Sequence, residues 1–465
     1  MQSSASLASI RANNSTPAVP SLDGRLRGFK LLFALVAFLW LAGEVAARHG
    51  IGASPTWFTA ISMRDDGCAM TCLASSFFFF LCARPRRREL VVLLAVALLL
   101  TGALRLLTAG LPPEVPLLLD VGCGIGLASL LLLGWRAWVS TGEDRIRILA
   151  LLLPAILVVL FIPLTKDFHR IGIQLNPDPV DDLLYAADDS LGVQLSFEVG
   201  RLFEAVPLLD RLSNFVYSTL PLPFVVVLIM QWRSQRPSNG NIFWDFQILA
   251  VLGFVVYMLF PAVGPGVVFP DVFPHAPPSA AEVLGEWGTN PGKWGGDWSD
   301  VARNCVPSLH TAWALMLWWH AQSLAGWVRG LTGYYLAFTV LATLGSGAHY
   351  AFDLILAVPF ALVVRAIGRP SLPGTSRVRW GACLVGTGLT TGLLLLIRFG
   401  LPVLAWSADL TRVASLGIVA LCLLWERKLD ALYQDPLAEA ERVPADGGSI
   451  PRSQARLQTL PLTVE

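Results

Sequence analysis

Residues 349–368 read HYAFDLILAVPFALVVRAIG, with a histidine and an aspartate four positions apart at the head of an apolar run. The run from 350 to 367 is long enough to cross the hydrocarbon core of a bilayer as a helix. Residues four apart in a helix share one face, so Asp353 can hold one ring nitrogen of His349 and leave the other free. The stretch therefore predicts a transmembrane helix that begins with a histidine–aspartate pair.

The rest of the chain is equally apolar. Of its 465 residues, 54% are hydrophobic and 14% are charged, against about 25% charged in an ordinary soluble domain. These values predict an all-α, polytopic transmembrane bundle of about 12 helices. The runs of spanning length are 29–47, 67–83, 90–110, 115–135, 147–165, 213–232, 242–261, 308–327, 331–348, 350–367, 381–399 and 404–425.

Arginine and lysine residues cluster directly after the even-numbered apolar runs. Cytoplasmic connections of membrane proteins hold the excess of lysine and arginine, so we expect both termini to be cytoplasmic. The connections that follow odd-numbered runs then face the non-cytoplasmic side. Two of these connections are long: the acidic loop 166–212 and the Pro-, Gly- and Trp-rich loop 262–307. The residues concerned are Arg84, Arg86, Arg87, Arg88, Arg136, Arg145, Arg147, Arg233, Arg236, Arg329, Arg365, Arg369, Arg377, Arg379, Arg427 and Lys428.

Five segments follow from this pattern. We expect the first apolar run to be retained, because the polar segment before it is long for a cleaved signal. The segments are a disordered cytoplasmic leader (1–28), an N-terminal transmembrane region of unknown role with the acidic loop (29–212), a segment that contains the histidine–aspartate pair (213–367), C-terminal transmembrane helices (368–426) and a disordered cytoplasmic tail (427–465).

A second motif precedes the run at 308–327, where residues 303–310 read RNCVPSLH. The topology places it at the same membrane face as His349. Pro307 and Ser308 suit the first positions of a helix, whose free N–H groups and dipole attract an anion. We predict Ser308, Arg303 and Asn304 as phosphate-binding residues. For Arg303, a purely interfacial role is the alternative.

The two motifs together, PSLH and then HYxxD about forty residues later, closely resemble the type 2 phosphatidic acid phosphatase superfamily. The Arg303-Asn304 pair that precedes the motif, and the motif sequence PSLH itself, are most similar to the inositol phosphorylceramide synthase branch of this superfamily. Residues 260–266, FPAVGPG, are similar to a segment that those proteins carry before the histidine motifs. The resemblance covers about 245–365 and implies a six-helix catalytic core in the C-terminal half.

The resemblance implies a mechanism. His349 attacks phosphorus and forms a phosphohistidine, Asp353 orients it, and His310 protonates the leaving oxygen. Water or a lipid alcohol then accepts the phosphoryl group. A covalent intermediate replaces one difficult step by two easier ones, and this chemistry requires neither a cofactor nor a metal.

Departures from the broader family pattern narrow the substrate. A lysine followed seven residues later by Arg-Pro is absent upstream of His310, and Thr343 stands where an arginine is expected six residues before His349. PSLH also replaces the more common PSGH. With fewer cations, a phosphodiester carrying one charge is favoured over a monoester carrying nearly two.

We therefore predict a lipid phosphotransferase that moves a phospho-headgroup from a membrane phospholipid to a lipid alcohol. Hydrolysis of phosphatidic acid or polyprenyl phosphate, with water as acceptor, is the first alternative. A non-enzymatic transporter or scaffold is the second, although residues 29–232 and 242–425 show no internal symmetry. The net charge of +1 does not favour a nucleic-acid partner, and the oligomeric state is left open.

The remaining motifs have simpler interpretations. The glycine-rich stretch 120–126, DVGCGIG, is expected to pack helices rather than bind a methyl donor or nucleotide, with Asp120 paired to Arg105. Cys305 is read as an inert neighbour of the motif. The tryptophans of the second long loop form an interfacial belt or a lid over the headgroup: Trp287, Trp294 and Trp298. Four other histidines are read as structural: His49, His169, His275 and His320.

Overall fold

The computed structural model describes residues 66–107, 117–234, 240–287, 291–294, 296–369 and 376–442, with four isolated positions between 34 and 48. Every element in these segments is helical, as predicted. Within the described segments, six helices are long and apolar enough to cross a membrane, and a bent pair makes seven if it is counted as one span. The protein is therefore an integral membrane protein. The six are α5 (Arg87–Leu107), α6 (Leu117–Val139), α12 (Ile242–Leu259), α17 (Ala351–Gly368), α18 (Ser376–Phe399) and α20 (Ala408–Arg442).

Helices also lie at the other predicted runs within the described segments. They are α4 (Asp66–Phe77) with the short η1 (Phe78–Ala83), α7 (Gly142–Leu175), the bent pair α10 (Pro207–Ser218) and α11 (Pro221–Ser234), α15 (Leu309–Ala321) and α16 (Gly326–Gly345). Most of the predicted run 29–47 lies outside the described residues, so the count of twelve stays a prediction. α20 continues to Arg442, into the predicted disordered tail, because leucine, alanine and glutamate there favour a helix.

The chain divides into two compact units, residues 1–161 and 162–465. In the first unit, Gly126 on α6 lies so close to α4 that a Cβ would collide with the backbone carbonyl of Cys72. The Nε of Arg105 donates to the Oδ2 of Asp120 over 2.7 Å. Both observations confirm the structural interpretation of the glycine-rich stretch.

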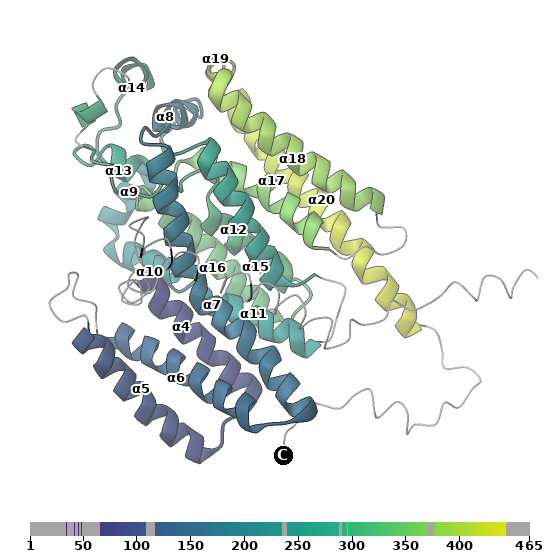
Figure 1. Cartoon of the computed structure of the whole chain (residues 1–465). Helices are drawn as coiled ribbons and strands as arrows, with labels where there is room; N and C mark the ends of the chain where they lie inside the picture. Colours follow the sequence, from purple (N-terminus) through teal and green to yellow (C-terminus); the bar gives the residue numbers. More distant parts are fainter. Residues whose placement is uncertain are drawn as a thin grey trace, which may run out of the picture. The chain divides into compact units, whose positions relative to one another are not determined.

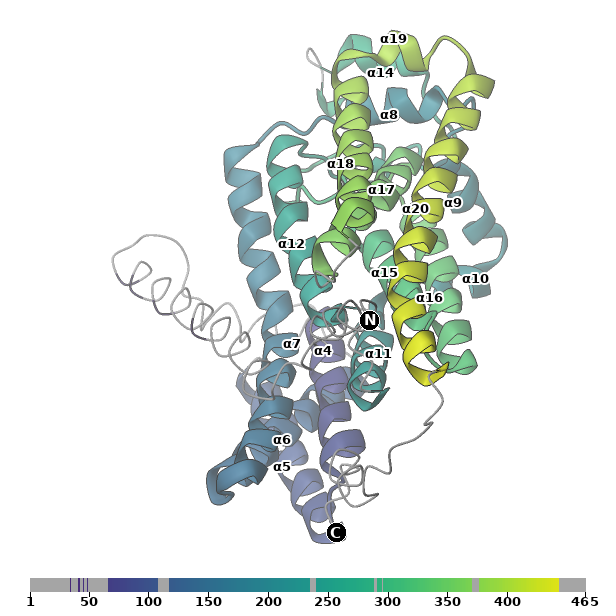
Figure 2. The same cartoon turned by 90° about the vertical axis from the view of Figure 1, so that its right-hand side faces the viewer.

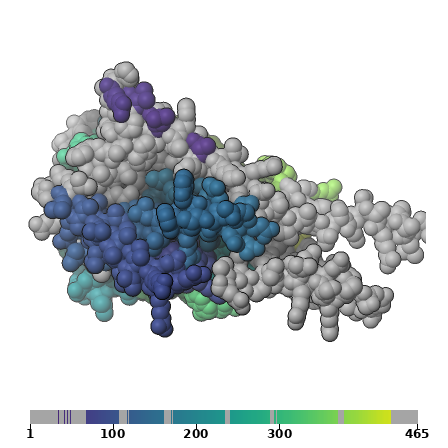
Figure 3. Space-filling model, turned by 60° about the horizontal axis from the view of Figure 1, so that its bottom comes forward, coloured from purple at the N-terminus to yellow at the C-terminus, as the bar shows by residue number. Residues whose placement is uncertain are grey.

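The helices of the first unit carry apolar side chains on the outside. On α5, Leu98 is 68% exposed and Leu106 is 80% exposed. Figure 3 shows the blue side chains of this unit at the surface. Water would penalise such a surface, whereas lipid chains solvate it, which fits a helix that crosses the bilayer.

In the second unit, α12, α15, α16 and α17 form a helical core, and α18 and α20 pack against α17. Short helices gather at one end of these long ones (Figures 1 and 2). Among them α8 is central, because it contacts α13, α14, α17, α18 and α19. The short helices are α8 (Asp181–Asp189), α9 (Leu195–Ala205), α13 (Pro265–Val268), α14 (Ala280–Glu286), η3 (Pro291–Trp294) and α19 (Leu401–Leu404).

A buried apolar cluster lies beneath α8. Its aromatic members include Tyr185, Phe197 and Phe269, which contact one another edge to face or tilted. Tyr350 and Phe352, at the start of α17, belong to the same cluster. The segment that carries the histidine–aspartate pair is therefore anchored in a buried apolar cluster.

Candidate active site

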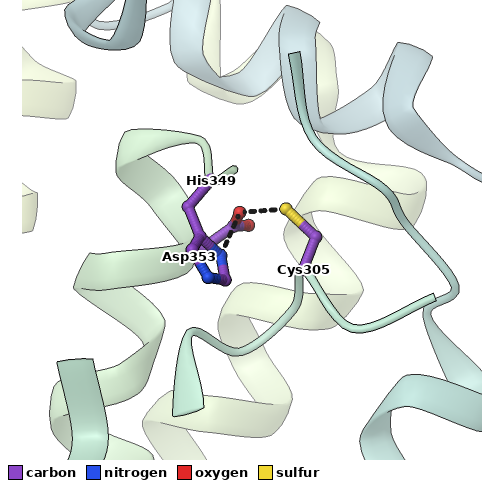
Figure 4. Close-up of side chains that lie close together, drawn as sticks. All are labelled: Cys305, His349 and Asp353. Carbon is purple, nitrogen blue, oxygen red and sulfur yellow. Dashed lines mark hydrogen bonds and ion pairs between the residues drawn. The ribbon is translucent and has the colours of Figure 1, made fainter. Parts of the chain in front are cut away.

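His349 and Asp353 lie at the turn that leads into α17. Tyr350 caps the helix, and its N–H donates to the Oδ2 of Asp353 over 2.8 Å. The same Oδ2 lies 3.5 Å from the Nδ1 of His349 (Figure 4). His349 precedes the first helical residue, so this capping turn, and not a shared helix face, brings the pair together. Both side chains are buried, and the arrangement leaves Nε2 of His349 for chemistry.

Cys305 is a third member of this group. Its Sγ donates to the Oδ2 of Asp353 over 2.7 Å. Burial raises the pKa of the thiol well above its usual range, and the charge on Asp353 raises it further. The thiol is therefore protonated at neutral pH and acts as a donor. Its position beside the PSLH motif was the only sequence signal for this contact.

The second motif meets the first at the head of α15. Ser308 caps this helix by accepting the N–H of Thr311 over 3.4 Å. The N–H of Ser308 donates to the backbone carbonyl of Asp353 over 3.3 Å. The structure thus brings the start of α15 against the start of α17, as the predicted topology requires.

His310 is the second residue of α15. Its Nδ1 is 2.9 Å from the hydroxyl of Tyr217 on α10, and the two rings lie tilted by 30° with centroids 4.1 Å apart. Trp313 packs edge-on against the imidazole. His310 also lies within electrostatic range of His349. Tyr217 orients the ring at one nitrogen, and no sequence pattern had pointed to it.

Arg303 has a different environment from the one predicted. Its guanidinium is buried and donates to four backbone carbonyls over 2.7–3.1 Å. These carbonyls belong to Asn176, Pro177, Trp298 and Val301. Burial lowers the pKa of Arg303. A phosphate contact from this side chain would have to replace one of these bonds, while the neighbouring Asn304 is half-buried.

Two carboxyl groups of α8 hold the backbone around the pair. Asp181 accepts the N–H groups of Val263 (3.0 Å) and Gly264 (2.8 Å) and the hydroxyl of Tyr350 (3.0 Å). Asp188 accepts the first two N–H groups of α17, from Ala351 and Phe352, over 2.7 and 2.9 Å. The sequence had marked this loop as acidic without assigning it a role.

The electrostatics of α8 follow from burial. Removal from water raises the pKa of Asp181 to about 7 and that of Asp188 to about 8. The N–H donors oppose this increase, and the charge on Asp353 adds to it. Three carboxyl groups therefore share one buried, electrostatically coupled region beside His349.

The FPAVGPG segment packs on the turn before His349. Gly264 has φ of +97° and ψ of 157°, and a Cβ there would lie 2.5 Å from the carbonyl oxygen of Ala348. The N–H of Gly266 donates to the carbonyl of Gly347 over 2.8 Å. Glycine at 264 is therefore needed for both its backbone conformation and the close approach.

The tryptophans of the long loop 262–307 pack against other residues of the chain. Trp287 and Trp298 stack with centroids 5.4 Å apart, and the indole N–H of Trp287 donates to the carbonyl of Pro179. Trp294 is buried against Phe269. These contacts fix the loop over the end of the bundle that contains the site.

Three of the other histidines lie within the described residues. His320 is buried and lies 2.7 Å from the Oδ2 of Asp245, and the exposed His275 lies 3.4 Å from Glu204. These contacts fit the structural roles predicted for the two residues. His169 packs against Phe254 and Tyr257 and lies within electrostatic range of His310, so it is a neighbour of the site. His49 lies outside the described residues.

Comparison with known families is consistent with this geometry. Residues 182–367 match the model of the PAP2 superfamily, which confirms the resemblance at the level of the superfamily. The matched segment contains both histidine motifs and Asp188. A PAP2 superfamily domain is consistent with a phosphatase or phosphotransferase enzyme. No curated protein and no solved structure matches the chain.

Proposed function

We propose that the protein is a membrane lipid phosphotransferase that moves a phospho-headgroup from a phospholipid to a lipid alcohol, in the manner of inositol phosphorylceramide synthases. The observation that carries this proposal is the buried His349–Asp353 pair at the start of α17, with the head of α15 bonded to it. It lies within the segment that matches the PAP2 superfamily.

The proposed reaction has two steps. In the first, Nε2 of His349 attacks phosphorus, the bond to the leaving oxygen breaks, and protonated His310 gives that oxygen its proton. In the second, neutral His310 takes the proton of the acceptor hydroxyl, whose oxygen attacks the phosphohistidine and releases His349. Asp353 stabilises the positive charge that develops on the attacking imidazole, and Tyr217 keeps the ring of His310 in place.

The charges around the pair support a phosphodiester donor. Arg303 is occupied by four carbonyls, and the buried Thr343 is neutral. The carboxylate of Asp353, 3.5 Å from His349, makes each additional negative charge on a substrate more costly. A phosphodiester carries one charge, whereas a phosphate monoester carries nearly two, so the same site favours the diester.

The arginine distribution supports a site on the non-cytoplasmic face with both termini in the cytoplasm. The proposed catalytic segment is 213–367, followed by C-terminal transmembrane helices at 368–426. Among the proposed phosphate-binding residues, Ser308 is linked directly to the pair, because its backbone N–H donates to the backbone carbonyl of Asp353. Asn304 adjoins Ser308 in the same motif, whereas Arg303 is held by four backbone carbonyls and fixes the loop instead of binding the phosphate.

The test is an assay of the purified protein in detergent. Phosphatidylinositol labelled in its headgroup is supplied with and without a lipid alcohol, beside phosphatidic acid. We expect transfer that requires the alcohol, and a covalent, acid-labile label on the wild type. His349→Ala should remove both, and His275→Ala, an exposed histidine, should retain both.

Two outcomes would contradict the proposal. Release of inorganic phosphate from phosphatidic acid, without headgroup transfer, would make the protein a phosphatase. Wild-type turnover no greater than that of His349→Ala on every substrate would argue against an enzyme that uses this histidine.

A further inference from the structure

We propose that Cys305, His349 and Asp353 form an inhibitory binding site for a thiophilic divalent cation, with Zn²⁺ as the best-suited ion. The binding site stands on its own geometry. The inhibitory consequence rests on the proposed function, because it assumes that His349 is the nucleophile.

The three side chains offer one ligand atom each, and these atoms all lie within 4.8 Å of one another. All three residues are buried, and Figure 4 shows their side chains close together. Two of their polar atoms, Nδ1 of His349 and Oδ1 of Asp353, make no hydrogen bond within the described part of the chain. Most buried polar atoms in folded proteins are bonded. Here Oδ1 of Asp353 has no hydrogen-bond partner and Nδ1 of His349 faces only Asp353 at 3.5 Å, so both atoms can serve as ligands for a cation beside the thiol.

The donor set selects the class of ion. A thiolate sulfur, an imidazole nitrogen and a carboxylate oxygen are the ligands that Zn²⁺ accepts, and three protein ligands with a fourth open position is a familiar zinc arrangement. Mg²⁺ and Ca²⁺ take oxygen ligands and would be poorly served by Cys305 and His349. The site therefore discriminates between the two kinds of ion.

Occupancy of this site would stop the proposed reaction. The thiol of Cys305 would lose its proton to water on binding, and the ion would bind the lone pair on Nδ1 of His349. The remaining ring proton would then sit on Nε2, which is the atom that must attack phosphorus. Asp353 would be engaged with the ion at the same time. The nucleophile and its orienting partner would both be withdrawn.

Cobalt provides a test that does not depend on turnover. The purified protein in detergent, with a non-chelating reductant, is titrated with Co²⁺ alone. We expect a near-ultraviolet thiolate-to-cobalt charge-transfer band that saturates at one ion per chain and is displaced by Zn²⁺. The band should be lost in Cys305→Ser and His349→Ala, and kept in Cys383→Ser, which removes a half-buried cysteine on α18.

Cys305→Ser keeps a hydroxyl that can donate to Asp353, and thermal unfolding verifies that each variant is folded. A wild type without the band, or a folded Cys305→Ser that retains it, would overturn the site. Because the band is measured without substrate, it decides the site even if every lipid in the activity assay fails.

Inhibition is tested separately, with each variant compared with its own zinc-free rate. We expect Zn²⁺ to inhibit the wild type, a chelator to restore the activity, and the inhibition constant to rise at least about tenfold in Cys305→Ser. Saturating zinc that leaves wild-type turnover unchanged would refute the inhibitory role.

Discussion

Asp181 and Asp188 lie seven residues apart on α8 and bind two different stretches of backbone. One carboxyl group holds the N–H groups of Val263 and Gly264, and the other holds those of Ala351 and Phe352. None of these hydrogen bonds involves His349 itself. They act as positioning residues, because the turn that carries the histidine is fixed between the two stretches that they hold.

Substitution of Asp188 tests this role. We expect Asp188→Asn to lower kcat by about 10- to 100-fold with little change in KM, because a small displacement of the nucleophile is costly even when substrate binding survives. Asp189→Asn is the matched control, since Asp189 is the exposed neighbour on the same helix. Steady-state kinetics of both variants would show the difference, and equal activities would argue against positioning by Asp188.

The raised pKa of Asp188 predicts a pH dependence. Its value of about 8 in the folded protein lies above the value of about 3.9 in an unfolded chain. The folded protein therefore binds more protons between these limits, and this contribution to stability is lost as the pH rises through the folded pKa.

We expect the apparent melting temperature of the wild type in detergent to fall as the pH is raised from about 5 to about 9. The decrease should be shallower in Asp188→Asn, which cannot ionise. Identical pH profiles for the two proteins would show that Asp188 does not titrate in this way.

At the scale of elements, the site is made by the ends of helices and by the loops between them. α15 and α17 begin at the same place, and the N–H of Ser308 joins them through the carbonyl of Asp353. The loop after α12 fills the space beside them, with Gly264 against Ala348. At the start of α17 the first N–H groups bind Asp353 and Asp188, and these bonds hold the turn that carries His349.

The packing of this loop predicts a strict requirement for glycine. Gly264→Ala should destabilise the protein by at least about 1–3 kcal/mol, because its backbone region is essentially restricted to glycine and its Cβ would meet Ala348. Gly285→Ala on α14 is the control, because a Cβ there would have no atom within 4 Å, and it should be neutral or slightly stabilising. Denaturant titration in detergent would measure both, and equal stabilities would contradict the packing argument.

At the scale of the second unit, a buried ionic cluster joins helices that lie far apart in the sequence. Arg365 on α17 bonds to His320 on α15 over 2.9 Å and lies 3.4 Å from Glu426 on α20. Arg369 forms an ion pair with Asp430. α20 follows the segment that matches the PAP2 superfamily, so the cluster connects this later helix to the matched segment.

Removal of one carboxylate from the cluster tests how much the cluster contributes to stability. We expect Asp430→Asn to reduce the free energy of unfolding by roughly 2–4 kcal/mol, because two buried arginines would lose a charged partner. Asp409→Asn removes an exposed carboxylate from the same helix and should change little. Unfolding curves in detergent distinguish the two, and a neutral Asp430→Asn would show that the cluster is not needed for stability.

The sequence by itself determined the helical class, the membrane environment and the two histidine motifs. Each of these is a local property: an apolar run of sufficient length, or a group of residue types at a short spacing. His349 and Asp353 were found because four residues separate them, and Ser308 because it stands at a helix start. The PAP2 superfamily match covers residues 182–367 and so includes both motifs.

Tertiary structure alone decided the contacts between distant parts of the chain. Asp181 bonds to the hydroxyl of Tyr350 across 169 positions, Tyr217 reaches His310 across 93, and Cys305 reaches Asp353 across 48. The carbonyls around Arg303 likewise come from two separate segments. No spacing encodes such pairs, because the partners are selected by how the helices pack and by the need of every buried polar group for a partner.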